Sequence, residues 1–153
     1  MNIIVQSLIL LVLMLSSASS LAKSFSQCIS GANTLHRLER EDTLLACFQS
    51  HKNFLGSDEC FNQISKLKVA QRSGILSEKL KGICFYEASI FQNDKLCLKR
   101  ADEFQNGENH DEAVFDCYKQ FQDKLSQKAC VEISNKLIYP AKRNHLYQHC
   151  MNN

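Results

Sequence analysis

Residues that break regular structure are scarce in this chain, which contains one proline, five glycines and no tryptophan. It also lacks the motifs of the common catalytic classes: a Gly-x-Ser-x-Gly elbow, a phosphate-binding glycine loop, His-Glu-x-x-His and Cys-x-x-Cys. We therefore predict no catalytic residue and no cofactor, and the sequence favours a protein that is not an enzyme.

A large excess of charge of one sign is also absent, because the formal net charge is only +2. This excludes a charge-based case for binding nucleic acid or an anionic membrane. Charge does separate along the chain: residues 102–116 hold six acidic residues without Lys or Arg, and residues 119–143 hold six basic and two acidic ones. The separation fits either an ordinary solvated surface or a polarised face that steers a protein partner.

The first 22 residues contain no Asp, Glu, Lys or Arg, and include the apolar run IIVQSLILLVLML. A run of this length followed by small residues predicts a secretory signal peptide, residues 1–22, cleaved near Ala22 and Lys23. We expect the remaining residues, 23–153, to form one domain without a stable membrane anchor, secreted or periplasmic.

All eight cysteines lie after this segment. An even number of cysteines in an exported protein predicts disulfide bonds rather than free thiols or a metal cage. The cysteines fall into two alternating classes, and the step from the second class to the next residue of the first is 13 residues each time. The first class is Cys28, Cys60, Cys97 and Cys130, and the second is Cys47, Cys84, Cys117 and Cys150.

Apolar or small residues recur four and seven positions after each first-class cysteine, which is the spacing of one face of an α-helix. The positions are Ala32, Ile64, Ala101 and Ser134, then Leu35, Leu67, Phe104 and Leu137. The same offsets in four registers predict an internal repeat of about 35 residues. The expected fold is all-α, with four disulfide-clipped helical hairpins forming a short α-solenoid or a compact helical bundle.

Two disulfide pairings remain open. Clips across each hairpin, which we favour, would join 28 with 47, 60 with 84, 97 with 117 and 130 with 150. Pairing across the constant 13-residue step would instead join 47 with 60 and its equivalents, and would leave Cys28 and Cys150 to pair from opposite ends of the chain.

Turn residues place the helices. Gly56 and Ser57 predict a helix end and a new cap, Ser77 a cap after Gly74, and Pro140 a helix start. Residues 109–112 have the spacing of a capping box. The predicted helices span 24–38, 41–55, 58–70, 77–92, 94–105, 110–123, 127–138 and 141–151.

The segments CFQSHKNFLGSDECFNQI (47–64) and CYKQFQDKLSQKACVEI (117–133) resemble the cysteine-rich repeat of Golgi-apparatus glycoproteins. Its units run cysteine, apolar residue, polar stretch, leucine, serine or proline, and cysteine. The resemblance covers three short junctions and implies a lumenal or secreted, all-α, disulfide-bonded binding module. It implies no catalytic residues.

Three other patterns suggest sites. His145 and His149 are four residues apart on a predicted helix, a spacing that can hold one metal ion, but Cys150 is taken by a disulfide and no third ligand is evident. Asp102 to Glu112 begins like a calcium loop but places Phe104 where an oxygen ligand belongs. His51 falls in a core register. We therefore predict no metal site.

The favoured function is an exported, non-catalytic binding module for a protein partner. The alternative is a carrier of a small apolar ligand in a cavity between helices, suggested by recurring aromatic residues whose other role is the core. A small secreted hydrolase or hydrolase inhibitor is a third possibility that no feature supports. The aromatic positions are Phe48, Phe54, Phe85, Phe91, Phe115, Tyr118 and Phe121.

Overall fold

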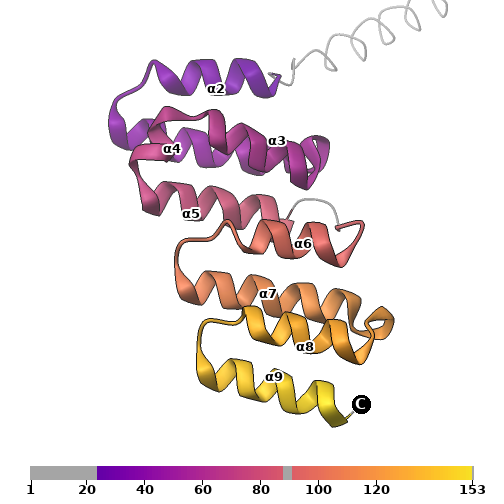
Figure 1. Ribbon diagram of the computed structural model, residues 1–153. Coiled ribbons are helices and arrows are strands. Elements are labelled where there is room, and N and C mark those ends of the chain that lie inside the picture. Colours follow the sequence, from indigo (N-terminus) through magenta and orange to yellow (C-terminus); the bar gives the residue numbers. More distant parts are fainter. Residues whose placement is uncertain (1–23, 88–90, 153) are drawn as a thin grey trace, which may run out of the picture. The chain divides into compact units, whose positions relative to one another are not determined.

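The computed structural model describes residues 24–87 and 91–152 (Figure 1). The predicted signal segment, 1–22, lies outside them. The described residues fall into two compact units, one up to Leu44 and one from Leu45 onward, and each is described by itself. None of the described helices is long and apolar enough to cross a membrane.

Every regular element in the described part of the chain is helical, so the predicted all-α class is confirmed. The α-helices are α2 (Phe25–Asn33), α3 (Arg37–Lys66), α4 (Lys68–Arg72), α5 (Gly74–Gly82), α6 (Asp94–Ala101), α7 (Gly107–Phe121), α8 (Gln127–Lys136) and α9 (Pro140–Asn152). A π-helical turn, η1 (Ile83–Glu87), follows α5, and a 3₁₀ turn, η2 (Gln122–Lys124), follows α7.

The long helix α3 is two helices joined at Gly56, where the backbone has φ 66° and ψ 159°. A positive φ is readily adopted by glycine, which has no Cβ to clash with the backbone. The helix end predicted at Gly56 is therefore confirmed. The cap predicted at Ser57 is wrong, because the buried Ser57 hydroxyl has no hydrogen-bond partner among the described residues. Pro140 also begins α9 as predicted, because its fixed φ suits the first turn of a helix and its missing N–H is not needed there.

Two further predicted caps are wrong. α5 begins at Gly74 because the Ser73 hydroxyl accepts the Leu76 N–H at 3.3 Å, so Ser77 lies inside the helix. α7 begins at Gly107 because the Asn106 side chain accepts the N–H groups of Glu108 and Asn109. In both cases the polar side chain just before the glycine satisfies the free donors of the first turn, and the glycine becomes the first helical residue.

The predicted repeat appears in the backbone as one recurring turn. Seven residues after each first-class cysteine, the N–H donates to the carbonyl oxygen three residues earlier, at 3.0 to 3.2 Å in all four hairpins. The four donors are Leu35, Leu67, Phe104 and Leu137. This turn ends the first helix of each hairpin, and in the second hairpin the short helix α4 lies between the turn and α5.

None of the cysteines is free. Disulfides join Cys60 to Cys84, Cys97 to Cys117 and Cys130 to Cys150, with Cα–Cα distances of 5.5, 5.7 and 5.6 Å. Cys28 and Cys47 are also disulfide-bonded. The three bonded pairs join the two arms of a hairpin, and none spans the 13-residue step.

Within the unit from Leu45 onward, α5, α6, α7, α8 and α9 lie beside one another in chain order (Figure 1). The disulfides lie in the core of this array, together with the apolar residues of the repeat register. Buried in this unit are Phe48, Phe61, Leu80, Phe85, Phe91, Phe104, Val114, Tyr118, Leu137 and Leu146, along with six cysteines from Cys60 onward and Cys47.

Candidate binding groove

Carboxylates at one repeat position connect consecutive hairpins. Glu78 and Asp111 each lie six residues before a second-class cysteine. Each accepts a hydrogen bond from the backbone N–H eight residues after the next first-class cysteine, Gln105 for Glu78 and Ile138 for Asp111. The second helix of one hairpin therefore holds the turn of the following hairpin. We did not predict this link, although the recurring offset was readable in the sequence.

Asp111 is completely buried. Its two carboxylate oxygens accept the N–H groups of Ile138 at 2.7 Å and Tyr139 at 2.9 Å, and the His110 ring nitrogen lies 3.2 Å away. Burial alone would raise the pKa of this carboxyl, but the hydrogen bonds and the attraction of His110 outweigh burial and lower it. Asp111 is therefore a structural anion that fixes the turn between α8 and α9.

Glu78 accepts a comparable set of hydrogen bonds and also pairs with a cation, Lys81. Its oxygens accept the Gln105 N–H at 2.9 Å and the Asn109 side-chain amide at 3.0 Å, and Lys81 Nζ lies 3.3 Å away. Burial opposes ionisation, but these donors together lower the pKa of Glu78. Lys81 also donates to the carbonyl oxygen of Glu103, so the buried pair is held from both hairpins.

A second buried cation adds to the same junction. Arg100 on α6 is 7% exposed and contacts the carboxylates of Asp58 and Glu103. Its guanidinium also lies 5.1 Å from the centre of the Phe61 ring. Burial would lower the pKa of Arg100, but its hydrogen bonds with the two acids raise it. This cluster joins α6 to the second half of α3.

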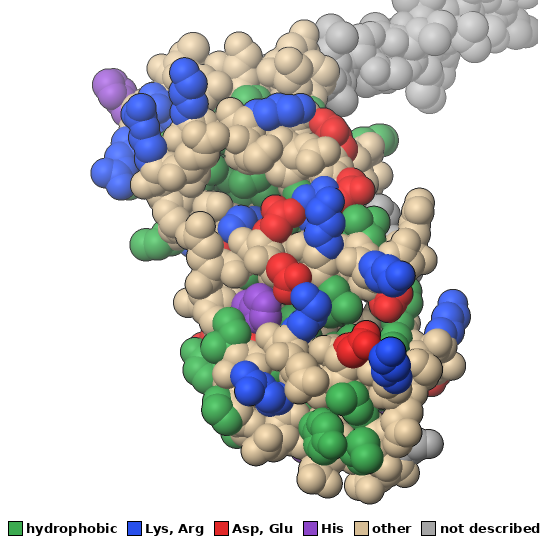
Figure 2. Space-filling model, viewed as in Figure 1, with side chains coloured by type: hydrophobic (Ala, Val, Ile, Leu, Met, Phe, Trp, Pro, Cys, Tyr) green, Lys and Arg blue, Asp and Glu red, His purple; other side chains and the backbone are tan. Residues whose placement is uncertain are grey.

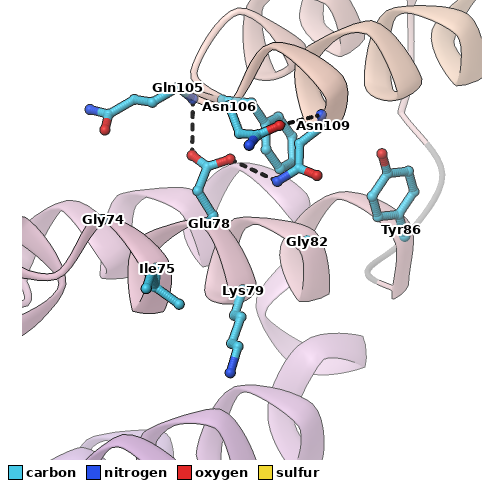
Figure 3. A pocket seen from close by; sticks show the side chains of 10 residues that line it. Gly74, Ile75, Glu78, Lys79, Gly82, Tyr86, Gln105, Asn106 and Asn109 are labelled. Atoms are coloured by element: carbon cyan, nitrogen blue, oxygen red, sulfur yellow. Dashed lines mark hydrogen bonds between the residues drawn. The ribbon is translucent and has the colours of Figure 1, made fainter.

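A cavity of about 620 Å³ opens beside Glu78, and we call it the α5 groove. Figure 3 shows Glu78 reaching across to Gln105 and Asn109, with Tyr86 at one end and with Ile75 and Lys79 along one edge. Ile75 is 75% exposed and Tyr86 46% exposed, so the groove is open to solvent. Its lining residues are Gly74, Ile75, Glu78, Lys79, Gly82, Tyr86, Phe104, Gln105, Asn106 and Asn109.

The α5 groove is open because two of its lining residues are glycines. A Cβ built on Gly74 or Gly82 would meet no atom within 4 Å outside its own neighbourhood. One repeat later, Phe115 occupies the position of Gly82, two residues before the second-class cysteine. Gly107 occupies that of Gly74, but there the Tyr139 hydroxyl and the Ile138 side chain would lie 3.5 and 3.6 Å from an added Cβ. Side chains therefore lie against the glycine at the junction around Asp111, whereas the space beside the glycines at the junction around Glu78 is open.

Aromatic side chains form one end of the groove. Tyr86 packs edge-on against Phe85, with ring centres 5.0 Å apart, and lies 6.5 Å from Phe104. Burial, followed by the nearby charges of Asp116 and Glu112, raises the pKa of Tyr86 to about 12. The phenol is therefore neutral at physiological pH and available as a hydrogen-bond donor.

His145 and His149, whose spacing could suit a metal ion, are both exposed on α9. His149 lies with its ring edge-on to Tyr118, at a centre distance of 5.8 Å. In the described part of the chain, no group of three or more His, Cys, Asp or Glu side chains is arranged to hold a metal ion.

Other polar candidates have ordinary structural partners. The His51 ring nitrogen lies 2.9 Å from the carbonyl oxygen of Cys47 and 3.0 Å from the Ser50 hydroxyl. In the calcium-like segment, Asp102 instead contacts Lys136 at 2.6 Å and His110 at 3.5 Å. Its carboxylate thus links the end of α6 to α8 and α7.

The aromatic residues considered for an apolar cavity differ in burial. Phe48, Phe85, Phe91 and Tyr118 are buried in the core, Phe115 and Phe121 are partly buried, and Phe54 is 87% exposed. Two further cavities, of about 380 and 370 Å³, have mixed polar and apolar linings with two charged side chains each.

The charge separation seen along the sequence is partly cancelled in space. Lys136 pairs with Asp102, and Lys119 pairs with Asp116 at 3.6 Å. On the face shown in Figure 2, acidic and basic side chains are interspersed along the unit from Leu45 onward. No protein-family model, curated protein or solved structure matches the chain.

Proposed function

We propose that this chain is a non-catalytic, disulfide-stabilised helical-repeat module of an oxidising compartment, and that it binds a protein partner through the α5 groove. Disulfides in all its hairpin arms suit such a compartment. The resemblance to the Golgi glycoprotein repeat supports the same class of function, because it implies a lumenal or secreted binding module. Secretion directed by residues 1–22 as a signal peptide is part of this proposal.

The observation that carries the proposal is the contrast between the two junctions. Glycine in a helix is about 1 kcal/mol less favourable than alanine, and nothing near Gly82 requires the absence of a Cβ. The following repeat has Phe115 at this position, so the architecture accommodates a large side chain there. A destabilising residue that only keeps space open is the kind of compromise that binding sites make.

The shape of the groove favours a protein over a small apolar ligand. Small-ligand sites bury most of the ligand surface, whereas Ile75 on the edge of this groove is 75% exposed. An open groove with an exposed apolar edge and a polar opposite edge matches the core and rim of a protein interface. The alternative of an apolar-ligand carrier would require a more enclosed apolar cavity.

The test is site-specific photocrosslinking in the native compartment, with a photoreactive phenylalanine analogue in place of Lys79. We expect a discrete protein adduct that Gly82→Phe abolishes, because the introduced ring copies Phe115 of the next repeat and fills the groove. Gly31→Phe is the matched control, since a Cβ added at Gly31 likewise meets no atom within 4 Å. The same analogue at Gln127, an exposed residue of α8, should not give this adduct.

Thermal unfolding of both phenylalanine variants shows that each is folded before crosslinking. Adducts that form equally at positions 79 and 127, or that persist in Gly82→Phe, would contradict binding through the groove.

A further inference from the structure

The Tyr86 end of the α5 groove has the composition of a site for a cationic side chain. The Tyr86 ring is held in place by Phe85 and Phe104, which are both 6% exposed, yet 46% of Tyr86 itself remains accessible. Figure 3 shows the ring standing at the end of the groove, clear of the Glu78 network. A rigid, accessible aromatic face attracts Lys or Arg through its electron-rich ring.

Two acidic side chains on α7 add negative charge at this end. Glu112 and Asp116 are one helical turn apart, and both act electrostatically on the Tyr86 phenol. Asp116 is 3.6 Å from Lys119, whose side chain is 66% exposed, so this pair is weakly held. Glu112 is exposed and forms no ion pair within the described residues.

Away from the Tyr86 end, the edge of the groove formed by Ile75 carries charge of the other sign. Lys79 is exposed and lies on α5 beside Ile75, away from the Tyr86 end (Figure 3). A basic residue of the occupant is repelled there and attracted toward Glu112 and Asp116. The Gln105 and Asn106 side chains, also exposed, are neutral and favour neither sign. The groove therefore has an electrostatic direction along its length.

We infer that the occupant of the α5 groove is a protein segment that places an apolar side chain over Gly82 and a lysine or arginine against the Tyr86 ring, beside Glu112 and Asp116. This inference rests on the proposed function and specifies the chemistry of the partner. Gly82 leaves space for the apolar side chain, and the Tyr86 ring contacts the cation. The carboxylates of Glu112 and Asp116 favour a positive over a negative charge at this end.

The experiment is a selection of random peptides displayed on phage against the disulfide-intact protein, with counter-selection against Gly82→Phe. We expect the recovered peptides to combine an apolar residue with a nearby Lys or Arg. The tightest peptide is then synthesised and its Kd measured for each variant. The double variant Glu112→Gln, Asp116→Asn should bind it about fivefold more weakly, since each exposed charge contributes modestly.

A matched double variant, Asp123→Asn with Glu132→Gln, removes two exposed acids that are not among the charges acting on Tyr86, and should change the Kd less than about twofold. Replacing the basic residue of the peptide by glutamine should weaken binding to the wild type more than binding to the Glu112→Gln, Asp116→Asn variant, in which only the contact with the Tyr86 ring is lost. This double-mutant cycle isolates the interaction of the cation with the two carboxylates.

The outcomes separate the two proposals. Peptides that require the open groove but show no enrichment of Lys or Arg, or bind the double variant equally well, would overturn the cationic occupant and leave groove binding intact. If no recovered peptide is sensitive to Gly82→Phe, groove binding fails, and the inference about its occupant fails with it.

Discussion

Asp111 and Glu78 hold equivalent positions in consecutive hairpins but lie in different surroundings. Asp111 is inaccessible to solvent and both its oxygens accept backbone N–H groups of the next turn. Glu78 accepts a hydrogen bond from only one backbone N–H, that of Gln105. Its other interactions are a hydrogen bond from the Asn109 side-chain amide and an ion pair with Lys81. The same repeat position therefore serves a closed junction in one place and the wall of an open groove in the other.

The difference lies in the residues around the carboxylate rather than in the repeat itself. Above Asp111, Ile138 and Tyr139 cover Gly107, and Phe115 occupies the second position before the cysteine. Around Glu78 the corresponding residues are Gln105, Asn106 and Gly82. Disulfides and helix lengths set the framework, and a few side chains decide whether a junction is closed or open.

The largest expected effect is that of Asp111→Ala, which should lower the free energy of unfolding by about 3–4 kcal/mol. The substitution leaves the N–H groups of Ile138 and Tyr139 without their acceptor and removes the partner of His110. Urea denaturation of the oxidised protein measures the loss. Asp116→Ala, on the same helix but in an exposed pair, should cost less than about 0.5 kcal/mol. Equal losses in the two variants would show that Asp111 does not fix the junction.

Removing one disulfide at a time tests whether the disulfides of the two regions contribute equally to the free energy of unfolding. The loops closed by Cys60–Cys84 and Cys97–Cys117 span 24 and 20 residues, so the chain-entropy model predicts a cost of about 3 kcal/mol for each. Double alanine variants of each pair, compared by urea denaturation, should therefore agree within about 1 kcal/mol. A much smaller loss for Cys60–Cys84 would mean that the groove side of the array is already loosely packed.

Glu78→Gln should cost less than Asp111→Ala, about 1–2 kcal/mol at pH 7, because the amide still offers one oxygen to the Gln105 N–H. The pKa of Glu78 is lowered in the folded protein from its ordinary value of 4.5. Its ionic contribution is therefore complete above that value and is lost as the pH falls through the folded pKa. The stability gap between the wild type and Glu78→Gln should narrow between pH 7 and pH 3. A gap that is independent of pH would contradict the role of the charge.

Much of the framework follows from sequence patterns with a local physical cause. The cysteine register and the residues four and seven positions later predict the hairpins, since one helical face must be buried. Gly56 and Pro140 mark helix boundaries through backbone geometry alone. Ser73 and Asn106 were missed as caps because each precedes a glycine that we expected to end or separate helices, whereas the glycine begins one.

The groove was not predictable in the same way. Its space depends on which residues face Gly74 and Gly82 across a junction, and these come from a segment about 30 residues later. The π-helical turn at Ile83–Glu87, which carries Tyr86, also departs from the regular register that sequence periodicity assumes. The recurring acid six residues before Cys84 and Cys117 was a readable signal for the network, but not for the empty space beside it.

The smallest expected effect is that of adding a single methyl group to the open space beside Gly82. Gly82→Ala should raise the free energy of unfolding by about 0.5–1 kcal/mol, because alanine favours the helix and the added Cβ meets no atom within 4 Å. Gly82 has no positive φ, so alanine adopts the same backbone without strain. Gly31→Ala should give a similar gain, since Gly31 in α2 shares both properties. Thermal unfolding of the two variants measures this. Stabilisation at position 31 with destabilisation at position 82 would mean that Gly82 is needed for packing, and its role in keeping a groove open for a partner would lose its support.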